Sequence, residues 1–412
     1  MLNQVPVPPK SIGDYAAVVG SGEIRRLRER AAPYAGARVL HVSSTAFGGG
    51  VAELLYTQVP LLADLGMHVE WRLLEGHEAF FTVTKAMHNG LQGAEIAFTN
   101  EMRALYMEVN SDNVSALHDS YDYIIVHDPQ PAAMPTIASN GRARGARWIW
   151  RCHIDLTQPF EPVWDFVNES VATYDNAIFT MADFVPANLE TPVTLMTPTI
   201  DPLSLKNIPM DHEMVAEVIH RYGIDQHRPI VVQVSRFDPW KDPTGVIDAF
   251  RLAREQIDGL QIVMIASMAH DDPEGWHYFS TTEEHRAGDP DIFLLSNLQE
   301  VGALEVNAFQ RAADVVLQKS IREGFGLTVS EGMWKRKPVI GGNVGGIRLQ
   351  ITDGESGFLV DSAEDCAKRI VEILSDPDRA AAMGSAARET VKDRYLTMRN
   401  LFDFLDLFDS LR

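Results

Sequence analysis

Cysteine is scarce in this 412-residue chain, which contains only Cys152 and Cys366. Two thiols so far apart in the sequence form neither a disulfide framework nor a zinc-ligand set, and they fit a reducing compartment. No apolar run approaches the roughly 18 residues that a membrane-crossing helix needs. The N-terminal segment also lacks the basic and apolar regions of a secretory signal. We therefore expect a cytoplasmic protein.

Basic residues are few as well, with 36 Lys and Arg against 57 Asp and Glu and a formal net charge of −21. This acidic balance argues against nucleic acids and anionic membranes as partners. No glycine-rich loop ends in Gly-Lys-Ser/Thr, which removes the best support for a phosphoryl-transfer enzyme. The 45% hydrophobic content is typical of a globular protein, and the length suggests two or three domains. The composition favours an enzyme whose few cations hold an anion.

The dominant pattern is a short apolar run, a turn of small residues and an amphipathic segment, repeated along the chain. Apolar runs rich in β-branched residues and bounded by turns indicate strands buried on both faces of parallel sheets. A first series of strands is predicted at 37–44, 67–74, 121–128, 146–153 and 176–181, and a second at 228–237, 260–267, 291–297, 313–319 and 337–342.

Between the two series, the Thr- and Pro-rich segment 191–207 is predicted to be an interdomain linker. After Asp361 the pattern is helical almost to the end of the chain. We therefore predict an α/β fold with two doubly wound domains, 1–202 and 203–380, followed by helices in 381–412. In such folds, ligands bind at the carboxyl ends of the strands.

A run of three glycines, Gly48 to Gly50, follows the first predicted strand and precedes a helix. Glycines at this place let backbone N–H groups approach a phosphate or a sugar at a helix N-terminus. A tight turn that needs positive φ is an equally good explanation. The spacing does not match the glycine pattern of a dinucleotide-binding loop.

A second candidate is the segment SRFDPWKDP (235–243), at the end of the first strand of the second series. It contains Arg236 and Lys241, which could clamp a diphosphate, the first as a planar fork and the second as a point charge. The alternative is a solvated loop in which these cations pair with Asp238 and Asp242.

The segment around Gly324-Phe325-Gly326 is the most informative in the chain. It follows a predicted strand and opens a helix whose first turn contains Leu327 and Thr328. Main-chain N–H groups and the helix dipole could therefore receive phosphates there.

Two carboxylates bracket this helix start. Glu323 lies in the preceding loop, where it could face a sugar, and Glu331 lies about two turns into the helix. Glu331 could accept hydrogen bonds from ribose hydroxyls. A single Glu at a helix start is explained by the dipole alone, but two around Gly-Phe-Gly are more specific.

Two His–Asp groups follow strands of the first series: His127 with Asp128 in HDPQP, and His153 with Asp155 in RCHID. A single histidine at a strand end is more often structural than catalytic. Two such groups on one sheet favour a pocket that binds a polyol. A metal site is the competing explanation, but adjacent residues do not have the spacing of ligands on one helical face.

Together, these motifs resemble those of retaining GT-B glycosyltransferases, the family of sucrose synthases, nucleotide-sugar glycogen synthases and trehalose-forming enzymes. The likeness rests on the E-x7-E motif with EGFG, the upstream Ser-Arg-Phe-Asp-x-x-Lys and the glycine loop after the first strand. Within this family, HDPQP, RCHID and QKSIREGFGLTVSEGMW are similar to the trehalose glycosyltransferring synthases. The resemblance implies two Rossmann-like domains facing each other across a hinged cleft, with the C-terminal helices packed back on the first domain.

The resemblance also implies roles for individual residues. The catalytic set would be Arg236 and Lys241 at the diphosphate, Glu323 at the glucosyl hydroxyls and His153 at the 6-hydroxyl of the donor sugar. The donor would further be bound by Gly49, Gly50, Gly324, Phe325, the N–H groups of Leu327 and Thr328, Glu331 at the ribose and Asn297 at the nucleobase. The acceptor side would consist of His127, Asp128, Gln130 and Asp155.

The implied activity is reversible formation of α,α-trehalose from a nucleoside-diphosphate glucose, such as UDP-glucose or ADP-glucose, and free glucose. Breaking the C1–O bond leaves an oxocarbenium-like sugar and a diphosphate, whose charge Arg236, Lys241 and the helix dipole would stabilise. No cofactor and no dedicated metal site are predicted, although Mg²⁺ can accompany the donor. No isolated carboxylate stands out as a nucleophile, so we predict same-face attack assisted by the leaving phosphate.

Two related functions stay open: a trehalose phosphorylase, and a retaining glucosyltransferase with another small polyol acceptor. A non-catalytic sugar-binding protein with two α/β domains is disfavoured by the missing secretory signal and by the charged set described above. The expected partners are small sugars, with no nucleic acid and no membrane. A homodimer is a further expectation from the resemblance.

Overall fold

A computed structural model describes residues 2–47, 49–117, 120–138, 143, 145–268 and 273–412. The chain divides into unit 1, Met1–Pro198 with Thr397–Arg412, and unit 2, Thr199–Leu396. The first boundary lies within the Thr- and Pro-rich segment, close to the predicted position. The second lies after residue 396 rather than after 380, so that only α16 (Thr397–Ser410) belongs to unit 1, whereas α15 (Pro377–Arg394) belongs to unit 2.

Unit 1 is built on a largely parallel sheet. Within the described residues its strand order is β1-β3-β2-β4-β5-β6-β7, and β1 alone runs antiparallel to its neighbour. The strands are β1 (Asn3–Gln4), β2 (Arg38–Ser43), β3 (His68–Leu73), β4 (Tyr123–His127), β5 (Arg147–Arg151), β6 (Asn176–Phe179) and β7 (Val193–Leu195). The central strands β2 and β4 are buried along nearly their whole length, as expected for a parallel sheet between helices.

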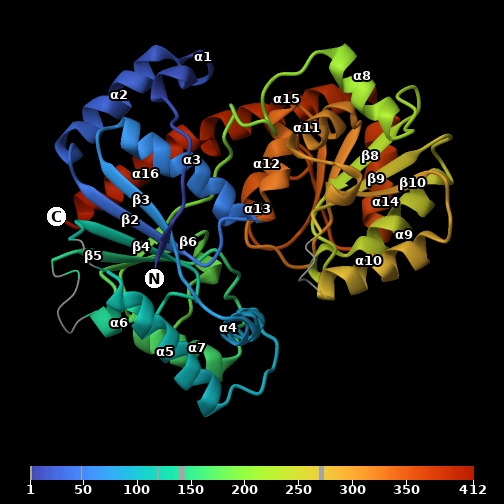
Figure 1. The fold of residues 1–412 in the computed structure, drawn as a ribbon. Coiled ribbons are helices and arrows are strands. Elements are labelled where there is room, and N and C mark those ends of the chain that lie inside the picture. Colours follow the sequence, from blue (N-terminus) through green and yellow to red (C-terminus); the bar gives the residue numbers. More distant parts are fainter. Residues whose placement is uncertain (1, 48, 118–119, 139–142, 144, 269–272) are drawn as a thin grey trace. The chain divides into compact units, whose positions relative to one another are not determined.

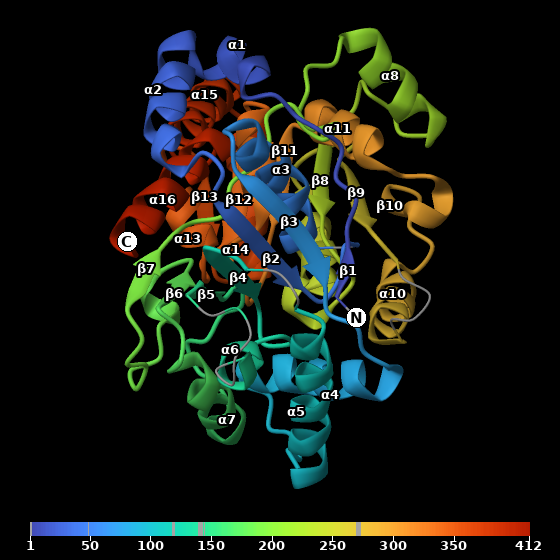
Figure 2. The same ribbon diagram turned by 60° about the vertical axis from the view of Figure 1, so that its left-hand side comes forward.

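Helices cover both faces of this sheet (Figures 1 and 2). On one face, Phe408 of α16 stacks on Tyr123 of β4 with ring centroids 4.0 Å apart. On the other face, Trp164 of α7 contacts Trp150 of β5. Besides α16, the helices of unit 1 are α1 (Ala16–Val19), α2 (Ser21–Ala31), α3 (Gly50–Asp64), α4 (Glu78–Leu91), α5 (Asn100–Ser115), α6 (Met134–Ala138) and α7 (Glu161–Val171).

Unit 2 contains a fully parallel sheet. Its order is β10-β9-β8-β11-β12-β13 within the described residues. The strands are β8 (Ile230–Val234), β9 (Gln261–Ala266), β10 (Ile292–Ser296), β11 (Val315–Gln318), β12 (Val339–Gly342) and β13 (Phe358–Val360). Besides α15, the helices are α8 (His212–Arg221), α9 (Pro243–Arg254), α10 (Pro273–Arg286), α11 (Ala303–Ala312), α12 (Leu327–Trp334), α13 (Ile347–Gln350) and α14 (Ala363–Leu374).

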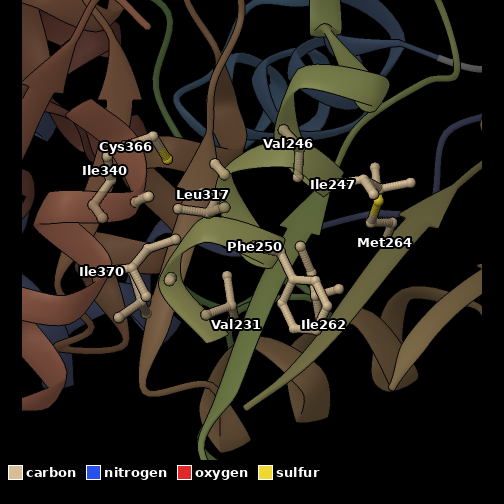
Figure 3. Close-up of a cluster of buried hydrophobic side chains, with 14 of the residues drawn as sticks. Val231, Val246, Ile247, Phe250, Ile262, Met264, Leu317, Ile340, Cys366 and Ile370 are labelled. Atoms are coloured by element: carbon tan, nitrogen blue, oxygen red, sulfur yellow. The ribbon is translucent and has the colours of Figure 1, made fainter. Parts of the chain in front are cut away.

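The core of unit 2 lies between this sheet and the helices α9 and α14 (Figure 3). Phe250 of α9 and Ile370 of α14 are fully buried against Val231, Leu317 and Ile340 from three neighbouring strands. α9 begins at Pro243 after Asp242, whose carboxylate accepts the N–H of Gly245. An Asp cap followed by Pro at the first helical position is a strong start signal. The local sequence therefore determines that α9 starts directly after the loop that follows β8.

The predicted fold class is confirmed, and every predicted strand is observed. The linker prediction for 191–207 needs one correction, because this segment contains β7, which pairs with β6 at the edge of the first sheet. β7, β1 and β13 are too short to give an apolar run of their own. Within the part of the chain that is described, no helix combines the length and apolarity required to cross a membrane.

The core of unit 2 gives a stability prediction. Replacing the fully buried Phe250 by Ala removes a ring from a close-packed cluster and should lower the free energy of unfolding by about 3–5 kcal/mol. Leu252→Ala on the same helix is the control, because that side chain is 37% exposed, and its effect should stay within about 0.5 kcal/mol. Denaturant titration of both variants measures the difference, and equal effects would contradict the core assignment.

Candidate active site

In unit 2, the predicted donor residues come from loops at one edge of the sheet. Arg236 and Lys241 follow β8, and Glu323 follows β11, which is the parallel neighbour of β8. The carboxyl ends of these two strands therefore lie side by side, and their loops meet there. The main-chain bond from Ile321 N–H to the carbonyl of Trp240, 2.8 Å long, ties the two loops together.

Lys241 and Glu323 form an ion pair. The Nζ atom of Lys241 lies 2.5 Å from Oε2 of Glu323, and the two side chains are only 14% and 12% exposed. The same carboxylate oxygen accepts hydrogen bonds from Nε2 of Gln318 and Oγ of Ser320, each 3.2 Å long. Several donors thus fix the position of Glu323, since a mostly buried carboxylate requires paired charge and hydrogen bonds.

Arg236 stands beside this pair with a 62% exposed side chain. Its Nη2 lies 3.0 Å from Oδ2 of the buried Asp238, whose Oδ1 accepts the main-chain N–H of Lys241. Burial raises the pKa of Asp238, and the charges of Arg236 and Lys241 oppose that rise. Asp238 therefore links the guanidinium of Arg236 to the backbone of Lys241, and the guanidinium keeps most of its surface for another anion.

The start of α12 adds main-chain donors to the same edge. Gly326 adopts φ +80° and no side chain caps the helix. Among the described residues, the N–H groups of Leu327 and Thr328 have no acceptor, whereas Oγ1 of Thr328 donates to Oε1 of Gln318, 2.7 Å away. Gln318 therefore joins the helix start to Glu323, and an uncapped helix N-terminus favours an anion.

The loop that precedes α12 is held by close packing. A Cβ atom on Gly346 would lie 2.5 Å from the carbonyl oxygen of Gly324, so only glycine fits there. The N–H of Gly346 donates to the carbonyl of Glu323 at 3.3 Å. Phe325 is buried and packs edge-on against Tyr395, with ring centroids 5.5 Å apart. Gly324 and Phe325 thus support the loop.

Glu331 is fully buried within α12. Its carboxylate lies 3.4 Å from Nζ of Lys206 and also accepts from Nε2 of Gln310. Burial raises the pKa of Glu331, but the ammonium groups of Lys206 and Lys335 outweigh this effect and hold the pKa below its usual value. The carboxylate is therefore ionised, and its partner Lys206 has a side chain that is 28% exposed.

Asn297 has a structural role in the loop after β10. Its amide makes reciprocal hydrogen bonds with the main chain of Met268, to the N–H at 2.6 Å and to the carbonyl at 3.0 Å. The N–H of the next residue, Leu298, is occupied by Oγ of Ser296. Among the described residues, no hydrogen bond joins the Asn297 side chain to the Lys241–Glu323 group, and its link to a nucleobase stays a prediction.

In unit 1, three histidines form a hydrogen-bonded chain. His41 lies in β2, His127 ends the neighbouring β4, and His153 follows β5. Nδ1 of His41 lies 3.0 Å from Nε2 of His127, and Nδ1 of His127 lies 3.0 Å from Nε2 of His153. Both ring nitrogens of His127 are therefore engaged, which makes it a bridge between two histidines, and its predicted contact with the acceptor stays a prediction.

This histidine chain is electrically neutral. Burial lowers the pKa of His41 to about 3. Burial also lowers the pKa values of His127 and His153 well below their usual range, and the positive charge of Arg151 acts in the same direction. Arg151 is 3% exposed, and its Nη1 has no hydrogen-bond partner within the described chain. The face of the sheet under α16 thus contains a buried cation beside uncharged imidazoles.

Asp128 stands at the same strand ends in an unusual conformation. Its φ is +64°, a left-handed value that non-glycine residues rarely adopt and that often marks a functional site. Its Oδ1 accepts the N–H of His153 at 2.8 Å. Burial raises the pKa of Asp128 to about 7, although the bond from His153 and the charge of Arg151 oppose the rise. The carboxyl group can therefore exchange a proton near neutral pH.

The other predicted residues of unit 1 differ in their hydrogen-bond partners and backbone conformation. Oε1 of Gln130 is a buried acceptor with no partner among the described residues, as expected if a ligand hydroxyl completes it. One carboxylate oxygen of Asp155 accepts the N–H and the hydroxyl of Thr157. Gly49 precedes α3 with φ +86° and Gly50 begins that helix, while Gly48 lies outside the described residues.

Sequence reasoning missed three residues that complete these groups: His41, Arg151 and Gln318. His41 and Arg151 could have been singled out from the sequence, because a polar or charged side chain within a buried apolar strand needs a partner. Their mutual contact depends on strand order, which the sequence does not specify. Within the described ranges, no group of three or more His, Cys, Asp or Glu side chains could hold a metal ion.

Comparisons with known proteins cover both units. Residues 41–186 match the family described as trehalose synthase, N-terminal domain, and residues 215–390 match glycosyl transferases group 1. A trehalose synthase of Rubrobacter xylanophilus is 49% identical over 100% of this chain and 99% of its own length, and one of Pyrococcus horikoshii is 44% identical over 98% and 97%. The solved α,α-trehalose 6-phosphate synthase of Burkholderia multivorans shares the fold, with a TM-score of 0.72 and 14% identity over 91% of this chain and 99% of its own.

The raised pKa of Asp128 predicts a pH-dependent stability. Its pKa is about 7 in the folded protein and near 3.8 when unfolded, so folding is favoured at low pH and this contribution is lost as pH rises towards 7. Between pH 5 and pH 8 the loss should be on the order of 2 kcal/mol. Asp128→Asn keeps the acceptor for His153 and tolerates positive φ, but does not titrate.

Denaturant titrations of both proteins at pH 5 and pH 8 measure this effect. The histidines titrate in both proteins, so the difference between them isolates Asp128. The wild type should lose more stability than Asp128→Asn on going to pH 8. Identical pH dependence in the two proteins would show that the carboxyl group is not perturbed.

Proposed function

This chain belongs to the trehalose synthase family of GT-B glycosyltransferases, and on that basis we propose that it forms α,α-trehalose from a nucleoside-diphosphate glucose and free glucose with retention at C1. The observation that carries the proposal is the group of cations and free N–H donors at one sheet edge of unit 2: Arg236, Lys241 and the start of α12. Their common chemistry is recognition of a phosphate-rich leaving group.

Arg236 and Lys241 have different parts in this proposal. The exposed guanidinium of Arg236 offers a planar pair of donors to one phosphate, whereas the ammonium of Lys241 is held in place by Glu323. As the C1–O bond breaks, negative charge grows on the diphosphate. Cations and N–H groups that are already oriented stabilise this charge without reorganising.

Glu323 is proposed to hold the glucosyl hydroxyls. Its carboxylate has one oxygen, Oε2, bonded to Lys241, Gln318 and Ser320, which leaves Oε1 to accept from a sugar. The neighbouring Gly324 and Phe325 fix the loop through Gly346 and Tyr395. Glu331 is proposed to meet the ribose once Lys206 moves aside, and Asn297 to mark the nucleobase side.

Unit 1 is proposed to bind sugar through uncharged groups. Gln130 has a buried amide oxygen that needs a donor. Asp128 accepts a hydrogen bond from the main-chain N–H of His153. A hexose presents uncharged hydroxyls and a ring oxygen, which pair with such neutral donors and acceptors. Gly49 and Gly50 would let a sugar or phosphate approach the backbone before α3, and Asp155 would contact the acceptor.

Same-face attack suits the carboxylates of this chain better than a covalent intermediate. Asp128 has a pKa near 7 and is therefore partly protonated at neutral pH, which makes it a weak nucleophile. Glu323 is already bonded to Lys241, and Asp155 is bonded to Thr157. The departing phosphate itself is then the base that receives the proton of the acceptor hydroxyl.

Proton NMR of the purified protein with UDP-glucose, ADP-glucose or GDP-glucose plus free glucose tests this function. The proposal predicts the single anomeric signal of symmetric α,α-trehalose together with release of a nucleoside diphosphate. If product forms with another polyol but not with glucose, that polyol and not glucose is the acceptor. Formation of glucose 1-phosphate from trehalose and phosphate, with no transfer from any nucleotide sugar, would identify a phosphorylase instead.

The cations give a mutational prediction. Arg236→Ala and Lys241→Ala should each lower kcat by about 10²–10³-fold, because each removes a charge that stabilises the leaving group in the transition state. Arg221→Ala on α8 is the matched control, since its side chain is 54% exposed and its partner Glu217 is 78% exposed. That variant should keep nearly full activity. Steady-state kinetics with a saturating donor measure the effect, and equal rates for all three variants would refute the assignment.

A further inference from the structure

The histidine chain of unit 1 extends from a fully buried end to a partly exposed one. His41 is 0% exposed under α16, where the ring of Phe404 packs edge-on against it with centroids 6.2 Å apart. The ring of His127 lies edge to edge with that of His41, with centroids 5.3 Å apart, and the ring of His153 lies in the same way beside His127 at the same distance. Two hydrogen bonds of 3.0 Å link the three rings in sequence. The chain thus connects the sheet interior to the residue proposed to meet the donor sugar.

The buried end determines which way these hydrogen bonds point. Nε2 of His41 has no partner among the described residues. A proton at that nitrogen would be a buried N–H without an acceptor, and such orphaned donors are rare in proteins. Hydrogen bonding therefore assigns the proton of His41 to Nδ1, which donates to His127.

Each neutral imidazole has one N–H and one acceptor nitrogen, so this assignment propagates outward. His127 accepts at Nε2 and must donate from Nδ1. His153 then accepts at Nε2 and has its own proton on Nδ1, for which the described chain supplies no acceptor. The depressed pKa values of the three rings keep each of them in its neutral form.

We propose that His41 is a positioning residue, which acts through His127 to hold His153 as its Nδ1–H tautomer, so that His153 always offers a donor to an oxygen of the bound sugar. This inference rests on the proposed function for the identity of the ligand, but the tautomer itself is a property of the protein alone. A freely rotating or reversed histidine would present an acceptor or a mixture. With its proton fixed on Nδ1, His153 favours a sugar whose hydroxyl oxygen can accept a hydrogen bond at that place.

Nitrogen-15 NMR of histidine-labelled protein tests the tautomer directly. The long-range couplings of ring protons to Nδ1 and Nε2 distinguish the two neutral forms. We expect Nδ1–H signals for His41, His127 and His153 in the wild type at pH 7.5, with assignments from single substitutions. An Nε2–H form of His153 in the wild type would overturn the proposal, whatever the variants do.

Three variants separate a hydrogen-bond effect from a packing effect. His41→Asn places an amide N–H near the position of Nδ1 and should preserve the tautomer of His153. His41→Leu fills the space without a donor and should give mixed tautomers. Phe404→Leu disturbs the packing of the His41 ring but leaves its Nδ1 donor in place, so it should behave as wild type in the spectrum.

Kinetics supply the second readout. His41→Leu should lower kcat about tenfold, the effect of losing one oriented hydrogen bond, while the Kd for the free nucleoside diphosphate stays unchanged because its proposed contacts lie in unit 2. His41→Asn should restore kcat to within about threefold of wild type. Equal losses in both His41 variants, or an unchanged tautomer in His41→Leu, would reduce His41 to a packing residue.

The two readouts separate failure of this inference from failure of the proposed function. If the tautomers follow the prediction but no nucleotide sugar is used, the proposed reaction is wrong and the histidine chain stands. If trehalose forms but the tautomers do not follow the prediction, the proposed reaction stands and the role of His41 is wrong. If His41→Leu does not fold, the wild-type spectrum and His41→Asn still decide the question.

Discussion

The interaction on which the proposed donor site depends is the ion pair between Lys241 and Glu323. It joins the loops after two adjacent strands of unit 2, and both partners are largely shielded from water. Shielding a cation costs free energy that a carboxylate partner offsets, and shielding a carboxylate costs free energy that surrounding donors offset. Gln318 and Ser320 complete that requirement and connect the pair to the start of α12. Removing either partner would leave its counterpart uncompensated.

The two units differ in how they treat charge. Unit 2 places Arg236 and Lys241 at one edge of its sheet, although the net charge of the chain is −21. Ion pairs and the conformation of the loops hold these two positive charges in place. Unit 1 has mostly uncharged groups at its corresponding strand ends: its three histidines are neutral and the pKa of Asp128 is raised, with Arg151 as the one cation described there. This division matches the chemistry of a nucleotide sugar, in which the diphosphate is anionic and the hexose is not.

Much of the fold was predictable because the buried strands are long apolar runs, and the candidate residues were predictable because they directly follow those runs. Short edge strands such as β7 were not, since three partly exposed residues give no pattern. The division between α15 and α16 was missed because both read as amphipathic helices, and only tertiary packing assigns α16 to unit 1. His127 was placed correctly at a strand end, but its bridging position depends on His41 in a neighbouring strand.

The most direct test of leaving-group stabilisation is a comparison of two donors in the same variants. α-Glucosyl fluoride transfers the same sugar but releases fluoride instead of a nucleoside diphosphate. We expect Arg236→Ala to lose about 10²–10³-fold in kcat with the nucleotide sugar and less than about tenfold with the fluoride, relative to wild type. Equal losses with both donors would show that Arg236 acts on the sugar or on the fold, and would contradict the central claim.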